Sequence, residues 1–391
     1  FEGVNGSGKH NNWSIATDGG MNLLDPGDSP HDNMQFLFFC AAVIRAVHKH
    51  ADLLRASVAS AANDHRLGAN EAPPAIMSVF LGEQLEDVFK QLVKGSAKSS
   101  KQGGLLGLGV ETLPSLPRHA GDRNRTSPFA FTGNKFEFRA VGSSQTVSVP
   151  NVILNVIVAS ALEEMSDMLE RALKGTRRNA QNFEVAVAGV LKTVVRNAQS
   201  VIFGGDNYTT DWHKEAEDRG LPNLRTTVDA LETLDGPKNV KLFKKYGVLS
   251  KKELQSRQEI FLEQYTLTIN IEAETTVSMA STMIMPAAVR YLNEIASTVT
   301  AAEGLGLKNS GARDVAKSVS SGIDALQKAT TKLSKLNQSN WGDGALTQAR
   351  FMEKKVIPAM RAVRDAGDLL ERIVARDHWP VPTYADILFV K

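Results

Sequence analysis

Long stretches with the periodicity of α-helices fill the chain beyond residue 150. We expect helices at residues 151–174, 177–202, 251–304, 312–336 and 346–377. Within the third, residues 266–273 alternate like a strand, but helical patterns flank them on both sides. We therefore expect a helix there as well, with a kink near Pro286, because proline cannot continue the hydrogen-bond ladder. The second half of the chain is predicted to be helical.

The first half of the chain mixes helical and strand-like patterns. Residues 31–62 contain no Pro or Gly, and apolar side chains nearly surround the helix axis, which predicts a buried helix. Residues 82–94 place four apolar side chains on one face and predict a second helix. Gly-rich residues 1–17 run into a β-prone segment, and residues 135–141 alternate polar and apolar side chains. We expect a strand in each of these two segments.

Two segments lack any regular period. Residues 95–134 are rich in Gly, Ser, Lys and Pro. Loops of about forty residues are uncommon in compact domains and tend to be functional, so we expect chemistry near residues 123–133. The tail, residues 379–389, is aromatic and interrupted by prolines, and it is expected to be an extended strap.

Composition argues against several classes of protein. With 391 residues, 42% of them hydrophobic, the chain can bury the cores of two or three domains. Lys and Arg number 45 and Asp and Glu 43, so the basic stripe of a nucleic-acid-binding protein is not expected. The longest apolar run, residues 36–44, is far shorter than the roughly 20 residues of a membrane-spanning helix. We expect neither nucleic acid nor membrane as a partner.

The start of the chain and its cysteine content bear on location. Cys40 is the only cysteine, so an intrachain disulfide is excluded and an oxidising compartment gains no support. Residue 1 is Phe, and no charged segment followed by an apolar one marks a signal peptide. We expect a cytoplasmic protein and a chain that begins within a domain.

The N-terminal segment nearly matches a phosphate-binding loop, because it reads Gly3-Val-Asn-Gly-Ser-Gly-Lys-His10. However, His10 stands where that loop needs a hydroxyl group, and a β-prone segment follows instead of a helix. We interpret the segment as a glycine turn that presents Asn5 and His10. On these residues alone, an ordinary turn with a surface histidine is the alternative.

Two further groups of charged residues could form a site. Arg66 and Glu71 lie on a Pro-terminated loop, where they could close over a substrate or form a solvated ion pair. Lys135, Glu137 and Arg139 share one face of the predicted strand. A carboxylate between two cations suits a metal–phosphate site, and the alternative is the exposed face of a half-buried sheet.

Three motifs, in this order, resemble those of glutamine synthetase and of its type III branch in particular. They are Asn5-Gly-Ser-Gly-Lys-His10, His65-Arg-Leu-Gly-Ala-Asn-Glu-Ala-Pro73 and Phe136-Glu-Phe-Arg139. The features similar to type III are residues 6–14, residues 125–139 and the helical tail that ends in residues 377–384. The resemblance therefore covers the whole chain.

The resemblance implies a ligase in which ATP phosphorylates the γ-carboxylate of L-glutamate and ammonia then displaces the phosphate. His10 and Glu137 would bind the divalent ion, Mg²⁺ or Mn²⁺, that bridges the ATP phosphates. Glu71 would be the flap carboxylate that binds ammonium, takes its proton and shields the acyl phosphate from water. Arg66 would be the second catalytic residue.

The same resemblance implies the binding residues. L-glutamate would be held by Asn5, Gly6, Arg66 and Arg139. The two arginines suit bidentate binding of carboxylate or phosphoryl oxygens. The nucleotide would be bound by Ser14, Arg125 and Lys135. Asn12 stands where type I enzymes carry a second histidine, and this departure concerns the nucleotide side of the site.

The resemblance also implies an α+β architecture. Residues 1–175 would form a partial antiparallel β-barrel, the C-terminal part of the glutamine synthetase catalytic domain, and residues 176–391 a mostly α-helical C-terminal domain. The family's N-terminal domain, with further metal ligands, would precede Phe1, so this chain alone is expected to be inactive or nearly so. The intact enzyme would be a homo-oligomer, a dodecamer of hexameric rings with active sites between subunits.

Two other functions stay open. One is a γ-glutamyl ligase that joins glutamate to an amine other than ammonia. The other is a catalytically silent structural or interaction protein with the same fold. The presence together of His10, Arg66, Glu71, Glu137 and Arg139 argues against the silent protein, because packing alone has no need of clustered charges.

Overall fold

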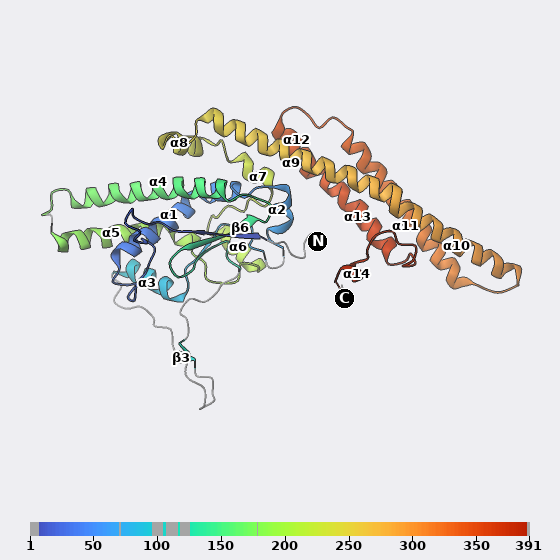
Figure 1. Cartoon of the computed structure of the whole chain (residues 1–391), viewed down its shortest axis with the longest axis horizontal. Helices are drawn as coiled ribbons and strands as arrows, with labels where there is room; N and C mark the ends of the chain where they lie inside the picture. Colours follow the sequence, from blue (N-terminus) through green and yellow to red (C-terminus); the bar gives the residue numbers. More distant parts are fainter. Residues whose placement is uncertain are drawn as a thin grey trace. The chain divides into compact units, whose positions relative to one another are not determined.

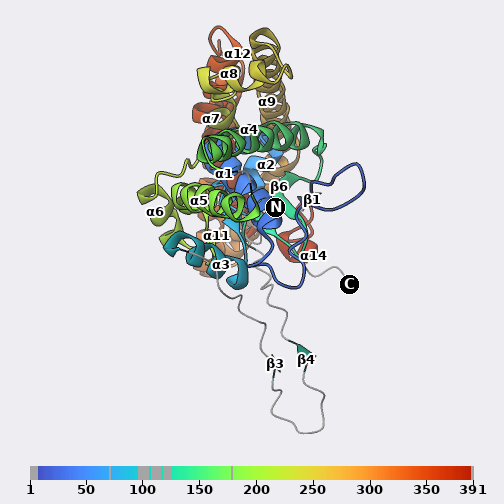
Figure 2. The same ribbon diagram turned by 90° about the vertical axis from the view of Figure 1, so that its left-hand side faces the viewer.

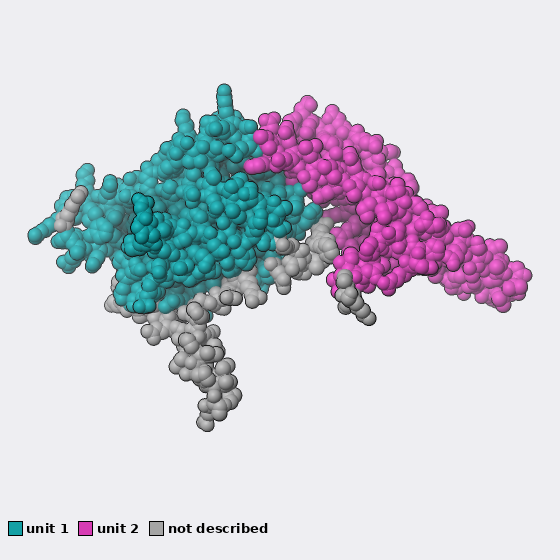
Figure 3. Space-filling model, viewed as in Figure 1, with its two compact units in different colours: residues 1–258 teal, residues 259–391 magenta. Residues whose placement is uncertain are grey.

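The computed structural model describes residues 8–69, 72–95, 105–106, 116–117, 126–177 and 179–388. The chain forms two compact units, Phe1–Gln258 and Glu259–Lys391 (Figure 3). Most of the described residues are helical (Figure 1). The α+β class is therefore confirmed. The boundary expected after residue 175 separates a catalytic domain from a helical C-terminal domain. The division into compact units does not test that boundary, so it stays a prediction.

Unit 1 is built on a four-stranded mixed sheet. Its strands, in spatial order, are β1 (Gly8–Trp13), β6 (Phe136–Gly142), β5 (Phe129–Phe131) and β2 (Val79–Phe80). The pairs β1–β6 and β5–β6 are antiparallel, whereas β2 and β5 run parallel. The sheet is open, so the described residues do not form the expected antiparallel barrel wall. A separate antiparallel pair joins β3 (Leu105–Leu106) and β4 (Leu116–Pro117).

An aromatic cluster joins the sheet to the first helix. Phe129 and Phe136 stack with ring centroids 5.1 Å apart, and Phe131 lies edge-on to Phe136 at 5.3 Å. Phe36 of helix α1 (Met34–Ala56) reaches Phe131 at 5.6 Å. Such pairs prefer offset or edge-on geometry and add to the free energy of burial. Every second side chain of β6 is thereby fixed in the core, as the alternation predicted.

Three long helices lie beside one another in unit 1. Helix α1 packs against α4 (Ser148–Leu173) and α5 (Ala180–Ala198), and α4 and α5 also pack together (Figure 2). Helix α3 (Glu83–Lys94) buries the apolar face that the sequence predicted, against α5. In β1, Gly8, Lys9 and His10 are exposed, whereas β6 is buried except for the half-buried Glu137.

The first predicted helix is shorter than expected. It ends at Ala56, and a separate six-residue helix, α2 (Ala61–Arg66), follows. Serines cause the break, because Ser57 donates its hydroxyl hydrogen to the Leu54 carbonyl and Ser60 caps α2 by accepting from the Asn63 amide. Serine side chains bond to nearby backbone and so favour helix ends over helix interiors. Helix α2, which carries Arg66, is therefore separate from α1.

Three short helices occupy the segment after α5, where the sequence suggested only turns. They are α6 (Thr210–Asp218), α7 (Thr227–Glu232) and α8 (Pro237–Lys245). Thr209 and Thr226 cap α6 and α7 with their side chains, and α8 begins with a proline at its first turn. Before them, Ile202 bridges to Val79, so the β2 edge of the sheet is also paired. The link is therefore an ordered part of unit 1.

Unit 2 is a bundle of long helices. Helix α9 (Lys251–Met279) begins in unit 1 and continues through the π-helical segment η2 (Ala280–Ile284) into α10 (Met285–Gly304). The strand-like residues 266–273 are thus helical, as predicted. The π-helical segment η2 directly precedes α10, whose first turn contains Pro286. The kink expected near Pro286 stays a prediction.

The rest of the bundle follows the predicted order. Helix α11 (Ser310–Asn337) packs against both α10 and α13 (Ile357–Glu371). Helix α12 (Ala345–Phe351) passes through a second π-helical segment, η3 (Met352–Val356), into α13, which also has a proline in its first turn. Within the described parts of the chain, no helix has the length and hydrophobicity to cross a membrane.

The expectation of an extended tail is wrong for residues 384–388, which form helix α14 (Tyr384–Leu388). Reciprocal capping explains it: Thr383 donates from its amide to Asp386 Oδ2 at 3.0 Å, and the Asp386 amide donates to Thr383 Oγ1 at 3.2 Å. Arg364 also donates to the Tyr384 hydroxyl at 2.9 Å and holds the tail on α13.

His50 makes the stability of unit 1 sensitive to acid. Its side chain is 4% exposed, and burial lowers its pKa to about 4, with Lys238 and Lys49 acting in the same direction and Asp52 and Glu164 opposing. Because the folded-state pKa lies below the ordinary value, stability is complete above about pH 6.5 and is lost as pH falls through 4. We expect a loss of about 3 kcal/mol from this group.

Urea unfolding at pH 7.5 and pH 4 measures this effect. His50→Gln is expected to flatten the pH dependence relative to the parent, whereas His213→Gln, a partly exposed histidine of α6, keeps it. An equal pH dependence in the parent and in His50→Gln would contradict the prediction.

Candidate active site

Strands β1 and β6 bring the predicted metal ligands together. Asn12 pairs with Glu137 across the two strands, and the register shifts between Lys9 and Asn11, so His10 sits in a bulge. Bulges re-aim side chains at the edges of sheets. His10 Nδ1 lies 3.5 Å from Glu137 Oε1, with the histidine side chain 58% exposed and the carboxylate 16% exposed.

The two oxygens of Glu137 have different neighbours. Oε2 accepts from Arg139 Nε at 2.7 Å and lies 2.7 Å from Arg139 Nη2, while Oε1 faces His10. Glu137 and Arg139 lie on the face of β6 opposite Phe136 and Phe138, as the alternation predicted. Both guanidinium nitrogens contact the same oxygen, Oε2, so Arg139 leaves Oε1 free of this ion pair. The strand therefore presents one carboxylate oxygen in a defined direction.

Arg66 joins this group from helix α2. Its Nη2 donates to the Arg139 carbonyl at 2.8 Å, and its Nη1 donates to Asn63 Oδ1 at 3.3 Å. The guanidinium packs closely against Gly8, since a Cβ built there would stand 2.0 Å from Arg66 Nη2 and Arg66 would have to shift. Arg66 belongs to the last turn of α2, whereas the sequence suggested a loop. Burial lowers its pKa, and the nearby Tyr208 opposes this.

The loop that follows α2 is closed at its base. Gly68, with a φ of 79° that favours glycine, donates its amide hydrogen to the Pro73 carbonyl at 3.0 Å. The predicted lid residue Glu71 lies outside the described residues. The same holds for Asn5, Gly6 and Arg125.

Ser14 and Lys135, expected on the nucleotide side, meet at the other end of the two strands. Trp13 pairs with Phe136, and Ser14 Oγ lies 2.6 Å from Asn22 Oδ1 and 3.2 Å from the Asn134 carbonyl. Lys135 directly precedes β6, and its carbonyl accepts from the Thr132 amide at 2.8 Å. One face of β1 and β6 thus carries two groups of predicted site residues.

Several contributors were missed by sequence reasoning. Asn63 donates to the Val58 and Ala140 carbonyls at 2.7 and 2.9 Å, and thereby ties α2 to β6. Asn11 donates to Asn151 at 2.8 Å, and Trp13 donates to Asn155 at 3.0 Å, which ties β1 to α4. The Asn-rich motif around Asn11 was a signal, but its partners lie about 140 residues away.

The donor set at His10 and Glu137 fits part of a divalent-ion site. Ligands about 2.1 Å from one ion stand roughly 3.0–3.5 Å apart, which matches the observed 3.5 Å. A neutral imidazole with a carboxylate suits Mn²⁺ and is compatible with Mg²⁺. The described residues contain no group of three or more His, Cys, Asp or Glu side chains placed to hold a metal ion. Two ligands are therefore what these residues supply.

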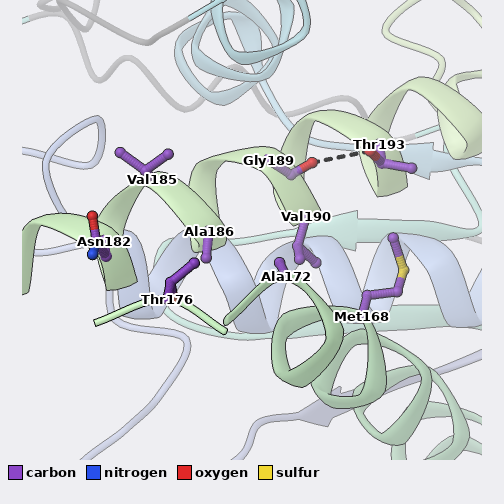
Figure 4. Close-up of a pocket in the computed structure, with 9 residues that line it drawn as sticks. All are labelled: Met168, Ala172, Thr176, Asn182, Val185, Ala186, Gly189, Val190 and Thr193. Carbon is purple, nitrogen blue, oxygen red and sulfur yellow. Dashed lines mark hydrogen bonds between the residues drawn. The ribbon is translucent and has the colours of Figure 1, made fainter. Parts of the chain in front are cut away.

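A concave region lies between α4 and α5, away from β1 and β6. It encloses about 380 Å³ and is lined mainly by small and apolar side chains, among them Met168, Val185 and Val190 (Figure 4). Its nine lining residues include none of the predicted site residues and no titratable side chain. The chemistry is therefore expected on the strands and not in this hollow.

Comparisons with known proteins agree with the geometry. The family model described as the glutamine synthetase C-terminal domain matches residues 186–303. The whole chain is 44% identical to the type-3 glutamine synthetase of Dictyostelium discoideum. The chain belongs to the glutamine synthetase family. It is also 35% identical to glutamine synthetase of Bacteroides fragilis (strain YCH46) and 37% identical to that of Butyrivibrio fibrisolvens, again over its full length.

The alignment covers only part of these glutamine synthetases. The chain spans 54%, 54% and 55% of the three relatives, about half of their length. The matched C-terminal domain begins within α5 and ends within α10, and so includes α6, α7 and α8. The strands with His10 and Glu137 precede the region that this domain model matches.

Proposed function

We propose that the protein to which this chain belongs is a glutamate–ammonia ligase. ATP phosphorylates the γ-carboxylate of L-glutamate, and ammonia displaces phosphate from the γ-glutamyl phosphate to give glutamine. The observation that carries this proposal is the joint placement of His10, Glu137, Arg139 and Arg66 at β1, β6 and α2. Similarity to glutamine synthetases along the whole chain supports the same reaction.

The chain's residues divide the work of the phosphoryl transfer. His10 Nδ1 and Glu137 Oε1 would hold a divalent ion, Mg²⁺ or Mn²⁺, which would supply positive charge to neutralise the ATP phosphates. Arg139 orients the Glu137 carboxylate, and Arg66 and Arg139 bring guanidinium groups toward the carboxylate of glutamate and the transferred phosphoryl oxygens. Both arginines are 8% exposed, so little water screens their charge.

The remaining roles follow the sequence motifs. Glu71 is proposed to bind ammonium and accept its proton while the lid excludes water. Asn5 and Gly6 contribute to the glutamate site. The nucleotide side is proposed to consist of Ser14, Arg125 and Lys135.

Larger-scale properties belong to the same proposal. The open sheet is proposed to be part of the family's barrel, completed by strands beyond those described. We place the catalytic part at residues 1–175 and the helical domain at residues 176–391, in a cytoplasmic enzyme. The helical bulk supports assembly into a ring-shaped homo-oligomer, with hexameric rings pairing into a dodecamer. Mass photometry of the full-length protein tests that assembly.

Two rival functions make different predictions. A γ-glutamyl ligase would use the same metal and ATP machinery but prefer another amine over ammonium. A silent scaffold would show no turnover at all. Arg139 is buried against Glu137, and Arg66 is buried and donates to the Arg139 carbonyl and to Asn63. This disfavours the scaffold, because burying two guanidinium groups is costly for packing alone.

The decisive assay measures ammonium-dependent phosphate release from ATP and L-glutamate, with Mg²⁺ or Mn²⁺, in the full-length protein. Glu71→Ala is expected to lower amide formation by about 10²–10⁴-fold, the usual range for a positioned acid–base group. Glu170→Ala, an exposed carboxylate of α4, is the matched control and should retain activity. Phosphate release that responds to another amine but not to ammonium would favour the first rival, and its complete absence in the parent would favour the second.

A further inference from the structure

Helix α2 is too short to hold its own geometry. It has six residues, Ala61–Arg66, and isolated helices of fewer than about 12 residues are marginal in water. The position of Arg66 therefore depends on what fastens α2 to the rest of unit 1. One fastening is Asn63, which donates to the Ala140 carbonyl of β6 at 2.9 Å.

The second fastening is Asp64, which joins α2 to α7. Its Oδ2 accepts from the Thr227 amide at 2.7 Å, and its Oδ1 accepts from the Thr227 hydroxyl at 2.7 Å. The carboxylate also accepts from Arg55 Nη2 at 3.0 Å. Thr227 is the first residue of α7, and Arg55 lies in the last turn of α1. One carboxylate thus connects three helices.

Arg55 of α1 is the third member of this cluster, beside Asp64 and Thr227. It is 1% exposed, and it donates from Nε to the Leu224 carbonyl at 2.8 Å and from Nη2 to the Arg225 carbonyl at 3.3 Å. A fully buried guanidinium needs such partners, and Nε and Nη2 have them, whereas Nη1 has no hydrogen-bond partner. The segment from Leu224 to Thr227 is thereby held against both α1 and α2.

We propose that Asp64 is a positioning residue for Arg66, and that α7 acts on the active site through it. Asp64 and Arg66 are two residues apart on α2, so they point to different sides of the helix. A shift of α2 at Asp64 therefore moves Arg66 relative to Gly8 and Arg139. Helix α7 lies inside residues 186–303, so the C-terminal domain of the family sets the geometry of a site that precedes it in the chain. This inference rests on the proposed role of Arg66.

Thr227 offers a mild test, because Asp64→Ala would leave Arg55 unpaired in the interior. Thr227→Val removes the hydroxyl donor but keeps the shape and the amide donor. We expect the KM for glutamate to rise about tenfold in the full-length protein, with the KM for ATP unchanged within about twofold, since small misplacements of binding groups cost up to about 10²-fold. Thr227→Ser restores the donor and is expected to restore the KM.

Thr226→Ala is the matched control. It removes the side-chain cap of α7, an acceptor 3.2 Å from the Asp229 amide, without touching Asp64. Thr226→Ala is therefore expected to weaken α7 and to leave the KM for glutamate unchanged. Equal KM changes for both substrates in Thr227→Val, or the same change in Thr226→Ala, would overturn the proposal.

Two further measurements separate this inference from the proposed function. In an Arg66→Lys background, Thr227→Val is expected to lose its effect, because the residue it positions is gone. The rate at which phenylglyoxal modifies Arg66, followed by mass spectrometry, should rise in Thr227→Val and not in Thr226→Ala, and it needs no ligase activity. A parent without ligase activity but with this difference in labelling would refute the function and keep the positioning role. An unchanged labelling rate in Thr227→Val would refute the positioning role.

Discussion

Replacing Glu137 by glutamine is expected to lower ligase turnover by about 10³-fold, the order of loss found for groups that stabilise transferring charge. Glutamine keeps an oxygen that can accept from Arg139, so the strand and its salt-bridge partner stay in place. It removes the negative charge that Oε1 presents 3.5 Å from His10 Nδ1. Of the two proposed metal ligands, His10 and Glu137, only Glu137 carries a negative charge. The variant would therefore leave the divalent ion without an anionic ligand from this pair.

The measurement is the rate of phosphate release as a function of Mn²⁺ and Mg²⁺ concentration. We expect Glu137→Gln to need more metal and to remain slow at saturation, with thermal unfolding changed by a few degrees at most. Glu184→Gln, which neutralises an exposed carboxylate on α5, serves as the control for net charge. Full turnover in Glu137→Gln at ordinary metal concentrations would rule out the metal role.

Asp64→Ala is expected to destabilise unit 1 by about 3–5 kcal/mol, the cost of removing one partner from a buried ion pair. Arg55, at 1% exposure, would keep its charge without the carboxylate, and Thr227 would lose the acceptor for two hydrogen bonds. Burial lowers the pKa of the Arg55 guanidinium, and the negative charge of Asp64 opposes this shift. Removing Asp64 therefore removes an interaction that favours the charged form of Arg55.

Urea unfolding followed by circular dichroism measures this loss. The double variant Arg55→Met/Asp64→Ala should recover part of it, because the unpaired charge is removed together with its partner. Asp324→Ala, an exposed carboxylate on α11, is the control and should change the free energy of unfolding by less than about 0.5 kcal/mol. A loss below 1 kcal/mol in Asp64→Ala would contradict the prediction.

Long elements were predictable from the sequence because their periodicity persists. Helices α4, α5 and α9 to α11 were expected close to their observed bounds. The run from α12 to α13 was expected as one helix over residues 346–377, and it ends earlier, at Glu371. The short helices were not predicted, because α6 and α7 depend on single threonine caps and α14 on the pair Thr383 and Asp386. Two-residue β2 carries no period at all, and its pairing with β5 is a tertiary event.

The site was predictable in part. The alternation in β6 placed Glu137 and Arg139 on one face, whereas only the resemblance to glutamine synthetase paired His10 with Glu137. What the sequence could not give is the bulge that aims His10, or the helix that carries Arg66, since both depend on hydrogen bonds between distant segments. The contact of Asp64 with Thr227 spans 163 residues and has no local signal.

That separation has a consequence for how the protein is made. At roughly 5–20 residues per second, a ribosome that has just added Asp64 needs about 8–33 s to reach Thr227, 163 residues later. During that interval Asp64, the partner of Arg55, is not yet bonded to Thr227. The bridge between Val79 and Ile202 likewise cannot form until Ile202 has been synthesised. The Asp64 contacts that hold α2 to α7 can therefore form only after Thr227 has been synthesised. A nascent chain stalled before residue 227 would expose an unfinished site to chaperones rather than to substrate.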